Sequence, residues 1–117
     1  EDVDFALCLN GSDTVVGAIA AKKSFRERWK EDAWTCGEAK RRNSNIMWIE
    51  ITDIEKPHKW STAHQLKFCD GIKRRCDSVK PGFDFLVSTS VPETVEKAFN
   101  ALEEHLRKCL ANRDEIA

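Results

Sequence analysis

The hydrophobic positions divide the chain into short apolar runs that are separated by polar turns. Residues 3–9 alternate between apolar and polar side chains over their first half, and an Asn-Gly-Ser triplet follows them. This pattern predicts a first strand. Residues 46–52 begin apolar on both faces of an extended chain, so they predict a strand that is covered on two sides. Residues 83–89 predict another strand, and the β-favouring residues 34–36 predict the first arm of a hairpin that residues 46–52 complete.

Three other segments repeat their apolar side chains at helical spacing. Residues 13–32 carry an apolar stripe with basic residues mostly elsewhere, which predicts a helix directly after the first strand. Residues 62–80 predict a second helix and residues 91–111 a third, with Pro92 in the first turn of the third helix. Residues 112–117 are expected to form a frayed tail.

The order of these elements predicts the fold. Strand, helix, strand, strand, helix, strand over residues 3–90 is the ferredoxin-like βαββαβ order, an α/β (α+β) sandwich with an antiparallel four-stranded sheet and two helices on one face. The additional C-terminal helix over 91–111 is expected to cover the other face, against Ile46 and Trp48. With 117 residues and no linker, the chain is expected to form a single domain over 1–117.

Composition narrows the class of partner and the compartment. The chain has 19 basic and 20 acidic side chains, so its net charge of −1 gives no overall attraction to phosphate backbones, and a nucleic acid partner is not expected. Its basic clusters are interpreted as solvated faces; they lie at Lys22-Lys23, Lys40-Arg41-Arg42 and Lys73-Arg74-Arg75. The sequence contains no apolar run of 18 or more residues, so no membrane span is predicted. The chain opens on Glu1, as a processed secreted protein does, and a cytoplasmic protein is the alternative.

The five cysteines are candidates for two disulfides with one thiol left over. They are Cys8, Cys36, Cys69, Cys76 and Cys109. Cys69 and Cys76 lie about 10.5 Å apart on one predicted helix, at 1.5 Å per residue, so they cannot bond to each other. All five also fall within predicted elements, so reduced core thiols are the alternative. Their spacing does not match zinc ligand pairs, and no metal or cofactor is expected.

The sequence gives catalysis little support. It has no glycine-rich phosphate loop and no nucleophile elbow, so the chain is expected not to be an enzyme. The sharpest enzymatic alternative is a thiol enzyme, with Cys36 as the nucleophile and His58 or His64 as the base.

The tryptophans predict a binding surface. Trp34, Trp48 and Trp60 cannot all lie on one buried face, and Arg41 and Arg42 are close by in the chain, so these five residues are candidates for contact with a partner protein. Asn10 begins an Asn-Gly-Ser sequon and is a candidate glycosylation site. The sequence makes no prediction about oligomeric state.

In element order and cysteine placement the chain resembles the killer-toxin-like secreted effectors of fungi. The residues that carry the resemblance are Cys8 in the first strand, Cys36, and Cys69 and Cys76 in the second helix. Cys109 and the terminal helix depart from that pattern. The resemblance implies a protein that acts outside the cell or in a host by binding or toxicity, with possible processing sites at Lys40-Arg41 and Lys73-Arg74.

The expected function is therefore that of a small secreted, non-enzymatic interaction protein, such as a pathogen virulence effector. An intracellular ferredoxin-like domain with reduced cysteines that binds protein or RNA is the first alternative, and a thiol enzyme is the second.

Overall fold

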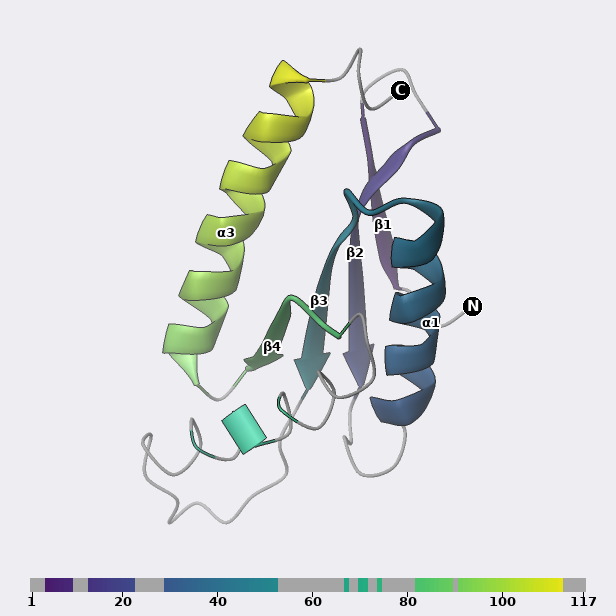
Figure 1. Cartoon of the computed structure of the whole chain (residues 1–117). Coiled ribbons are helices and arrows are strands. Elements are labelled where there is room, and N and C mark those ends of the chain that lie inside the picture. Colours follow the sequence, from purple (N-terminus) through teal and green to yellow (C-terminus); the bar gives the residue numbers. More distant parts are fainter. Residues whose placement is uncertain are drawn as a thin grey trace.

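The computed structural model describes residues 4–9, 13–22, 29–52, 82–89 and 91–112, and the single residues 67, 70, 71 and 74. The elements in chain order are β1 (Phe5–Cys8), β2 (Val15–Lys22), α1 (Trp29–Arg42), β3 (Met47–Thr52), β4 (Phe85–Ser88) and α3 (Pro92–Ala111) (Figure 1). The predicted strands over 3–9, 46–52 and 83–89 and the predicted C-terminal helix are confirmed. Of the predicted helix over 62–80, the four described residues are helical and the others lie outside the described residues.

The sheet is mixed, with strand order β1-β2-β3-β4. β1 runs antiparallel to β2, whereas β2, β3 and β4 are parallel to one another. The α/β class is thus confirmed, but the predicted ferredoxin-like antiparallel sheet is wrong: only β1 and β2 pair in antiparallel fashion, and β2 is not one of the predicted strands. The reason is that β2 occupies the place of a predicted helix and α1 the place of a predicted hairpin arm. The chain therefore crosses over through α1 from β2 to a parallel β3.

β2 is a strand because it lies inside the sheet, between β1 and β3. Its sequence is apolar on both faces up to Lys22, as expected of a strand that has a helix on each side. Such a run does not alternate, and its apolar residues can match helical spacing by coincidence. The β-branched Val15 and Val16 favour the extended conformation that the sheet imposes.

α1 is a helix whose described buried side chains are small residues and one carboxylate, with no large apolar side chain among them. Asp32, Ala33, Cys36 and Gly37 are buried, at the spacing of one helical face. Acidic residues in the first turn and basic residues in the last complement the helix dipole. A search for large apolar residues at helical spacing misses such a helix, so the β-favouring residues 34–36 gave the wrong prediction.

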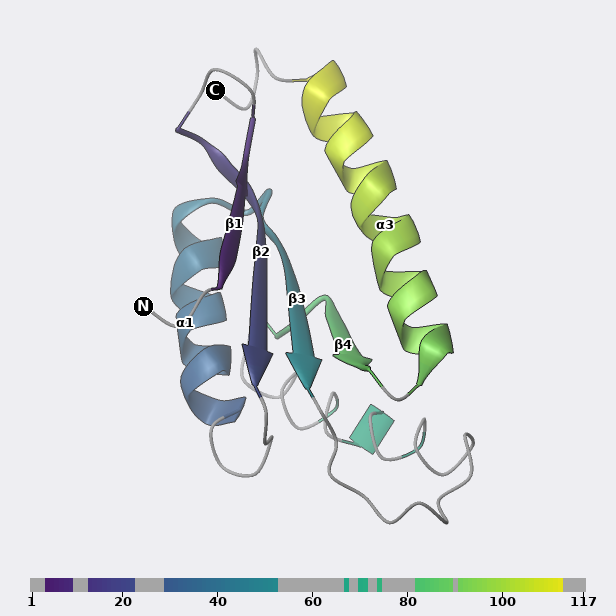
Figure 2. The same ribbon diagram turned by 180° about the vertical axis from the view of Figure 1, so that it is seen from behind.

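The two helices lie on opposite faces of the sheet (Figures 1 and 2). The core on the α1 side consists of Ala18, Ala20, Ala33, Cys36, Ile46, Trp48, Phe83 and Leu86. The core on the α3 side consists of Ile49, Val87, Ala98 and Leu102, with partly buried neighbours. Cover on both faces of β3 is therefore confirmed, but Ile46 and Trp48 face α1 and not the C-terminal helix. Among the described residues, no helix is long and apolar enough to cross a membrane.

Candidate functional site

The residues predicted for partner binding divide between the surface and the core. Trp34 is 66% exposed on α1, and Arg41 and Arg42 are exposed at the end of the same helix. Trp48 is fully buried and stacks on Phe83 with ring centroids 6.3 Å apart, so its assignment to a surface is wrong. Trp60 lies outside the described residues. The predicted surface is thus reduced to residues of α1.

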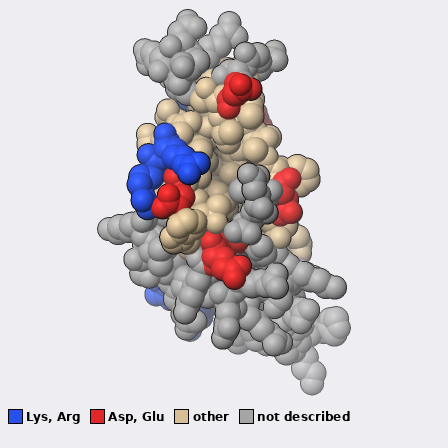
Figure 3. Space-filling view, turned by 90° about the vertical axis from the view of Figure 1, so that its right-hand side faces the viewer, with Lys and Arg blue, Asp and Glu red and all other residues tan. Residues whose placement is uncertain are grey.

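We call the exposed side of α1 that carries Trp34, Glu38, Arg41 and Arg42 the α1 outer face. Trp34, Glu38 and Arg41 follow one another at helical spacing, so they project from the same side. Arg41 Nη2 pairs with Glu38 Oε1 at 2.9 Å. Figure 3 views the molecule from the α1 side, where basic and acidic side chains lie next to each other, beside an uncharged surface. This face offers an aromatic side chain beside a paired arginine.

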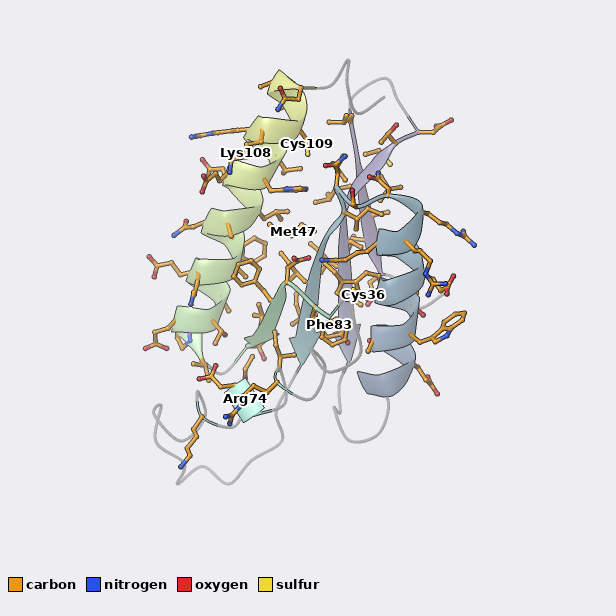
Figure 4. All side chains as sticks on the ribbon, in the orientation of Figure 1. Cys36, Met47, Arg74, Phe83, Lys108 and Cys109 are labelled. Carbon is orange, nitrogen blue, oxygen red and sulfur yellow. The ribbon has the colours of Figure 1, made fainter. Side chains whose placement is uncertain are left out.

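The opposite side of α1 is fixed to the sheet through Asp84, which precedes β4. Asp84 Oδ2 accepts hydrogen bonds from Trp48 N at 2.7 Å and from the Lys40 ammonium. Asp84 N in turn donates to Trp48 O at 3.0 Å. Cys36 Sγ donates to Gly82 O at 3.6 Å, so two side chains of α1 reach the segment that leads into β4 (Figure 4).

Two carboxylates, Asp32 and Glu50, are fully buried in the layer between α1 and the sheet. Glu50 Oε1 accepts a hydrogen bond from Trp48 Nε1 at 2.9 Å. Asp32 lies one turn before Cys36 on the buried side of α1. Because solvent does not reach these carboxylates, we interpret them as part of a structural polar network and not as ligands for an external group.

Cys36 is unsuited to nucleophilic catalysis. Burial raises the pKa of its thiol to about 12; the nearby Lys40 charge lowers it, and the Asp84 and Glu50 charges raise it. The thiol is therefore protonated at neutral pH, whereas a nucleophilic cysteine needs a low pKa. His58 and His64, the predicted bases, lie outside the described residues.

A cysteine and a histidine meet on α3, and the i, i+4 spacing of His105 and Cys109 is the only sign of this contact in the sequence. Cys109 Sγ lies 3.6 Å from His105 Nε2, and the same nitrogen lies 2.9 Å from Val16 O. A carbonyl oxygen only accepts, so Nε2 must carry the proton and cannot take one from the thiol. Burial also raises the pKa of Cys109. The pair is a packing contact at the β1–β2 bulge and has no features of an activated thiol.

Cys8, Cys36 and Cys109 are free thiols in this structure, and Cys69 and Cys76 lie outside the described residues. Two disulfides would need at least two of the three free thiols, so the disulfide scheme stays a prediction. Cys36 and Cys109 belong to separate cores, so they are not partners for each other. Asn10, the glycosylation candidate, lies outside the described residues.

No three His, Cys, Asp or Glu side chains of the described part of the chain are placed to hold a metal ion. Comparison with known proteins adds no further site: no family model, curated protein or solved structure matches the chain.

Proposed function

We propose that the chain is a small, non-enzymatic interaction protein that binds a partner protein through the α1 outer face. Trp34 is the observation that supports this most. Its side chain is 66% exposed in the middle of a 14-residue helix that is otherwise fixed to the sheet by its opposite side. Large exposed aromatic residues are enriched at binding hot spots, and a rigid helix presents them at low entropic cost.

Arg41 supplies a second contact of the kind that interfaces favour. It lies about 10.5 Å from Trp34 along the helix axis, at 1.5 Å per residue. The Arg41 side chain is 71% exposed, so its guanidinium can exchange the Glu38 carboxylate for one on a partner at little cost. Trp and Arg are the residue types most often found at binding hot spots.

Secretion and action as an effector belong to the same proposal. The α1 outer face supports the binding part of this proposal, and the killer-toxin-like resemblance adds no support, because the βαββαβ order that carried the resemblance differs from the observed order. A thiol count on denatured native material tests secretion. One free thiol supports an oxidised, secreted protein, whereas five free thiols contradict it.

Comparative capture tests the binding surface. The immobilised chain is exposed to extract from its native setting, and bound proteins are quantified for the wild type, Trp34→Ala and Phe99→Ala. Phe99 is a matched control because it is 45% exposed on α3, at the other face of the sheet. We expect a bound protein that Trp34→Ala loses at least tenfold and Phe99→Ala retains. Equal retention by both variants contradicts the proposal.

One observation favours a second candidate function, the binding of a phosphate-bearing ligand such as RNA. β2, β3 and β4 all end on the same side of the sheet, at the carboxyl ends of its parallel strands, and α1 and α3 both begin on that side (Figure 1). We call this side the carboxyl edge. β2 ends at Lys22, and the exposed Arg74 lies at this edge in Figure 4. The end of β2 and Arg74 thus both lie on the side of the sheet where its parallel strands end, and parallel sheets most often bind ligands there. The net charge of the whole chain does not reveal such a local arrangement.

Binding of a labelled single-stranded RNA tests this candidate. Fluorescence anisotropy at low and high salt compares the wild type with Lys22→Ala, Arg74→Ala and the control Arg107→Ala, an exposed arginine on α3. If the edge binds phosphate, the first two variants weaken binding severalfold and flatten its salt dependence, and the control does not. Absence of binding at low salt excludes this candidate.

A further inference from the structure

β1 has the sequence of an interior strand but lies at the edge of the sheet. Its four residues, Phe5–Cys8, are uncharged and apolar, and all but Leu7 are exposed. Phe5 is 65% exposed. Open edges are normally protected by charged residues, proline or a covering element. The carboxylate of Asp4, just before β1, accepts a hydrogen bond from Ala21 N at 2.7 Å and so points to β2.

The backbone of β1 has hydrogen-bonding groups on its open side. Ile19 O accepts from Asp4 N at 3.1 Å, and Ala21 N donates to the Asp4 side chain, so these backbone groups of β2 face β1. Successive residues of a strand direct their backbone groups to opposite neighbours. Leu9 N donates to Thr14 O at 3.2 Å and so faces β2, as do Leu7 and Phe5 by this alternation, which leaves the N–H and C=O groups of Ala6 and Cys8 on the open side.

We infer that β1 binds β1 of a second copy of this chain, in antiparallel register about a two-fold axis at Leu7. Ala6 of each copy then exchanges both backbone hydrogen bonds with Cys8 of the other copy. Leu7 lies opposite its counterpart, and Phe5 lies opposite Leu9. Opposed residues project from the same face of the sheet, as an antiparallel pair requires.

The chemistry of the edge favours a second copy as the occupant. The segment from Phe5 to Leu9 contains no charged side chain, so pairing it with itself places no like charges opposite each other. The two four-stranded sheets would become one continuous sheet, and each Phe5 would lose part of its exposure to water. A strand of four residues gives a small interface, so we expect a weak dimer that depends on concentration.

A register-specific crosslink tests this pairing. In the inferred dimer, Cys8 of one copy is two positions from Cys8 of the other, beyond disulfide reach, whereas residue 6 lies directly opposite Cys8, about 5.5 Å away between α-carbons. Ala6→Cys is therefore expected to form a 6–8 disulfide between copies in oxidised glutathione. Non-reducing gels and peptide mapping should show at least tenfold more of this dimer than for the wild type or for Ala6→Cys combined with Cys8→Ser.

Sedimentation of the unoxidised protein gives an independent measurement. The wild type is expected to shift from monomer toward dimer as its concentration rises, and Phe5→Lys is expected to stay monomeric because two positive charges flank the pair. Circular dichroism confirms that each variant is folded. A wild type that remains monomeric at millimolar concentration, together with no 6–8 crosslink, overturns the inference. So does a dimer that Phe5→Lys leaves unchanged.

Discussion

The indole Nε1 of Trp48 donates a hydrogen bond to Oε1 of Glu50, two residues further along β3, at 2.9 Å. Both side chains are fully buried on the face of the sheet that α1 covers. Trp48 thus satisfies a buried carboxylate and is not available for binding. Trp48 and Glu50 thus lie under the buried side of α1, which supports the fold, whereas the α1 outer face is the side that we propose binds a partner.

Replacing Trp48 tests the structural role. Trp48→Phe keeps an aromatic ring but removes the donor to Glu50, and a buried acceptor that loses its donor costs about 1–3 kcal/mol. We expect a loss of this size in the free energy of urea unfolding. Trp34→Phe, on the exposed side, is the matched control and should change stability by less than about 0.5 kcal/mol. Equal effects of the two substitutions contradict the assignment.

Asp84 is expected to be the strongest link between α1 and the sheet. Asp84→Ala leaves both Trp48 N and the Lys40 ammonium without the acceptor that Asp84 provides. We therefore expect the free energy of unfolding to fall by about 2–4 kcal/mol. Asp84→Asn keeps an oxygen that can accept from Trp48 N, so it should lower the free energy of unfolding by less than Asp84→Ala does. Glu103→Ala removes an exposed pair with Arg107 and should lose less than about 0.5 kcal/mol. If Asp84→Ala unfolds no more easily than Glu103→Ala, the link is not important for stability.

The strands with clear borders and the long C-terminal helix could be predicted from sequence because their local signals agree with their surroundings. Residues 47–52 are β-favouring, and residues 92–111 combine Pro92 at the start with a regular apolar stripe. β2 and α1 could not be predicted, because tertiary context decides both. β2 lacks alternation since helices cover both of its faces, and α1 buries Asp32 and Cys36 where a periodic search expects large apolar residues.

The candidate site was predicted in part for a related reason. Trp34, Arg41 and Arg42 were named from the sequence because their residue types are common at interfaces; the structure places all three at the surface, and their binding role stays a prediction. Trp48 was included wrongly because its buried hydrogen-bond partner, Glu50, cannot be recognised without the strand's depth in the sheet. The contact between Asp84 and Lys40 joins residues that are far apart in the chain, so no short sequence motif predicts it.

Stability at high pH is expected to depend on Cys36. The pKa of its thiol is about 12 in the folded state, against an ordinary value of 9.0 for a cysteine, so the unfolded chain releases its proton first. Between pH 9 and 12 the unfolded state binds fewer protons, and stability falls as pH rises, by at most about 1.4 kcal/mol per pH unit. Urea unfolding of the wild type and Cys36→Ala across this range should differ in slope. Parallel curves would falsify the shift in pKa.

Gly17 is expected to resist substitution because it lies opposite Leu7 in the β1–β2 pair. A β-carbon at position 17 would lie 3.0 Å from Leu7 Cδ1 and 3.3 Å from Leu7 Cβ, so β1 would have to shift. Gly17→Ala should therefore destabilise by about 1 kcal/mol or more, and less so in combination with Leu7→Ala. Gly71→Ala is the control, since nothing lies within 4 Å of its β-carbon. Thermal unfolding that ranks the two alanines equally would contradict this reading of the contact.

We propose that the α1 outer face contacts a partner protein while the rest of α1 supports the fold. Site-specific photo-crosslinking tests it most directly, with benzoylphenylalanine placed at position 34 or, as the control, at position 99 on α3. Illumination in native extract followed by mass spectrometry should join position 34, and not position 99, to one protein in stoichiometric yield. Arg41→Ala should reduce this product severalfold. The same yield at both positions, or none at position 34, contradicts the account.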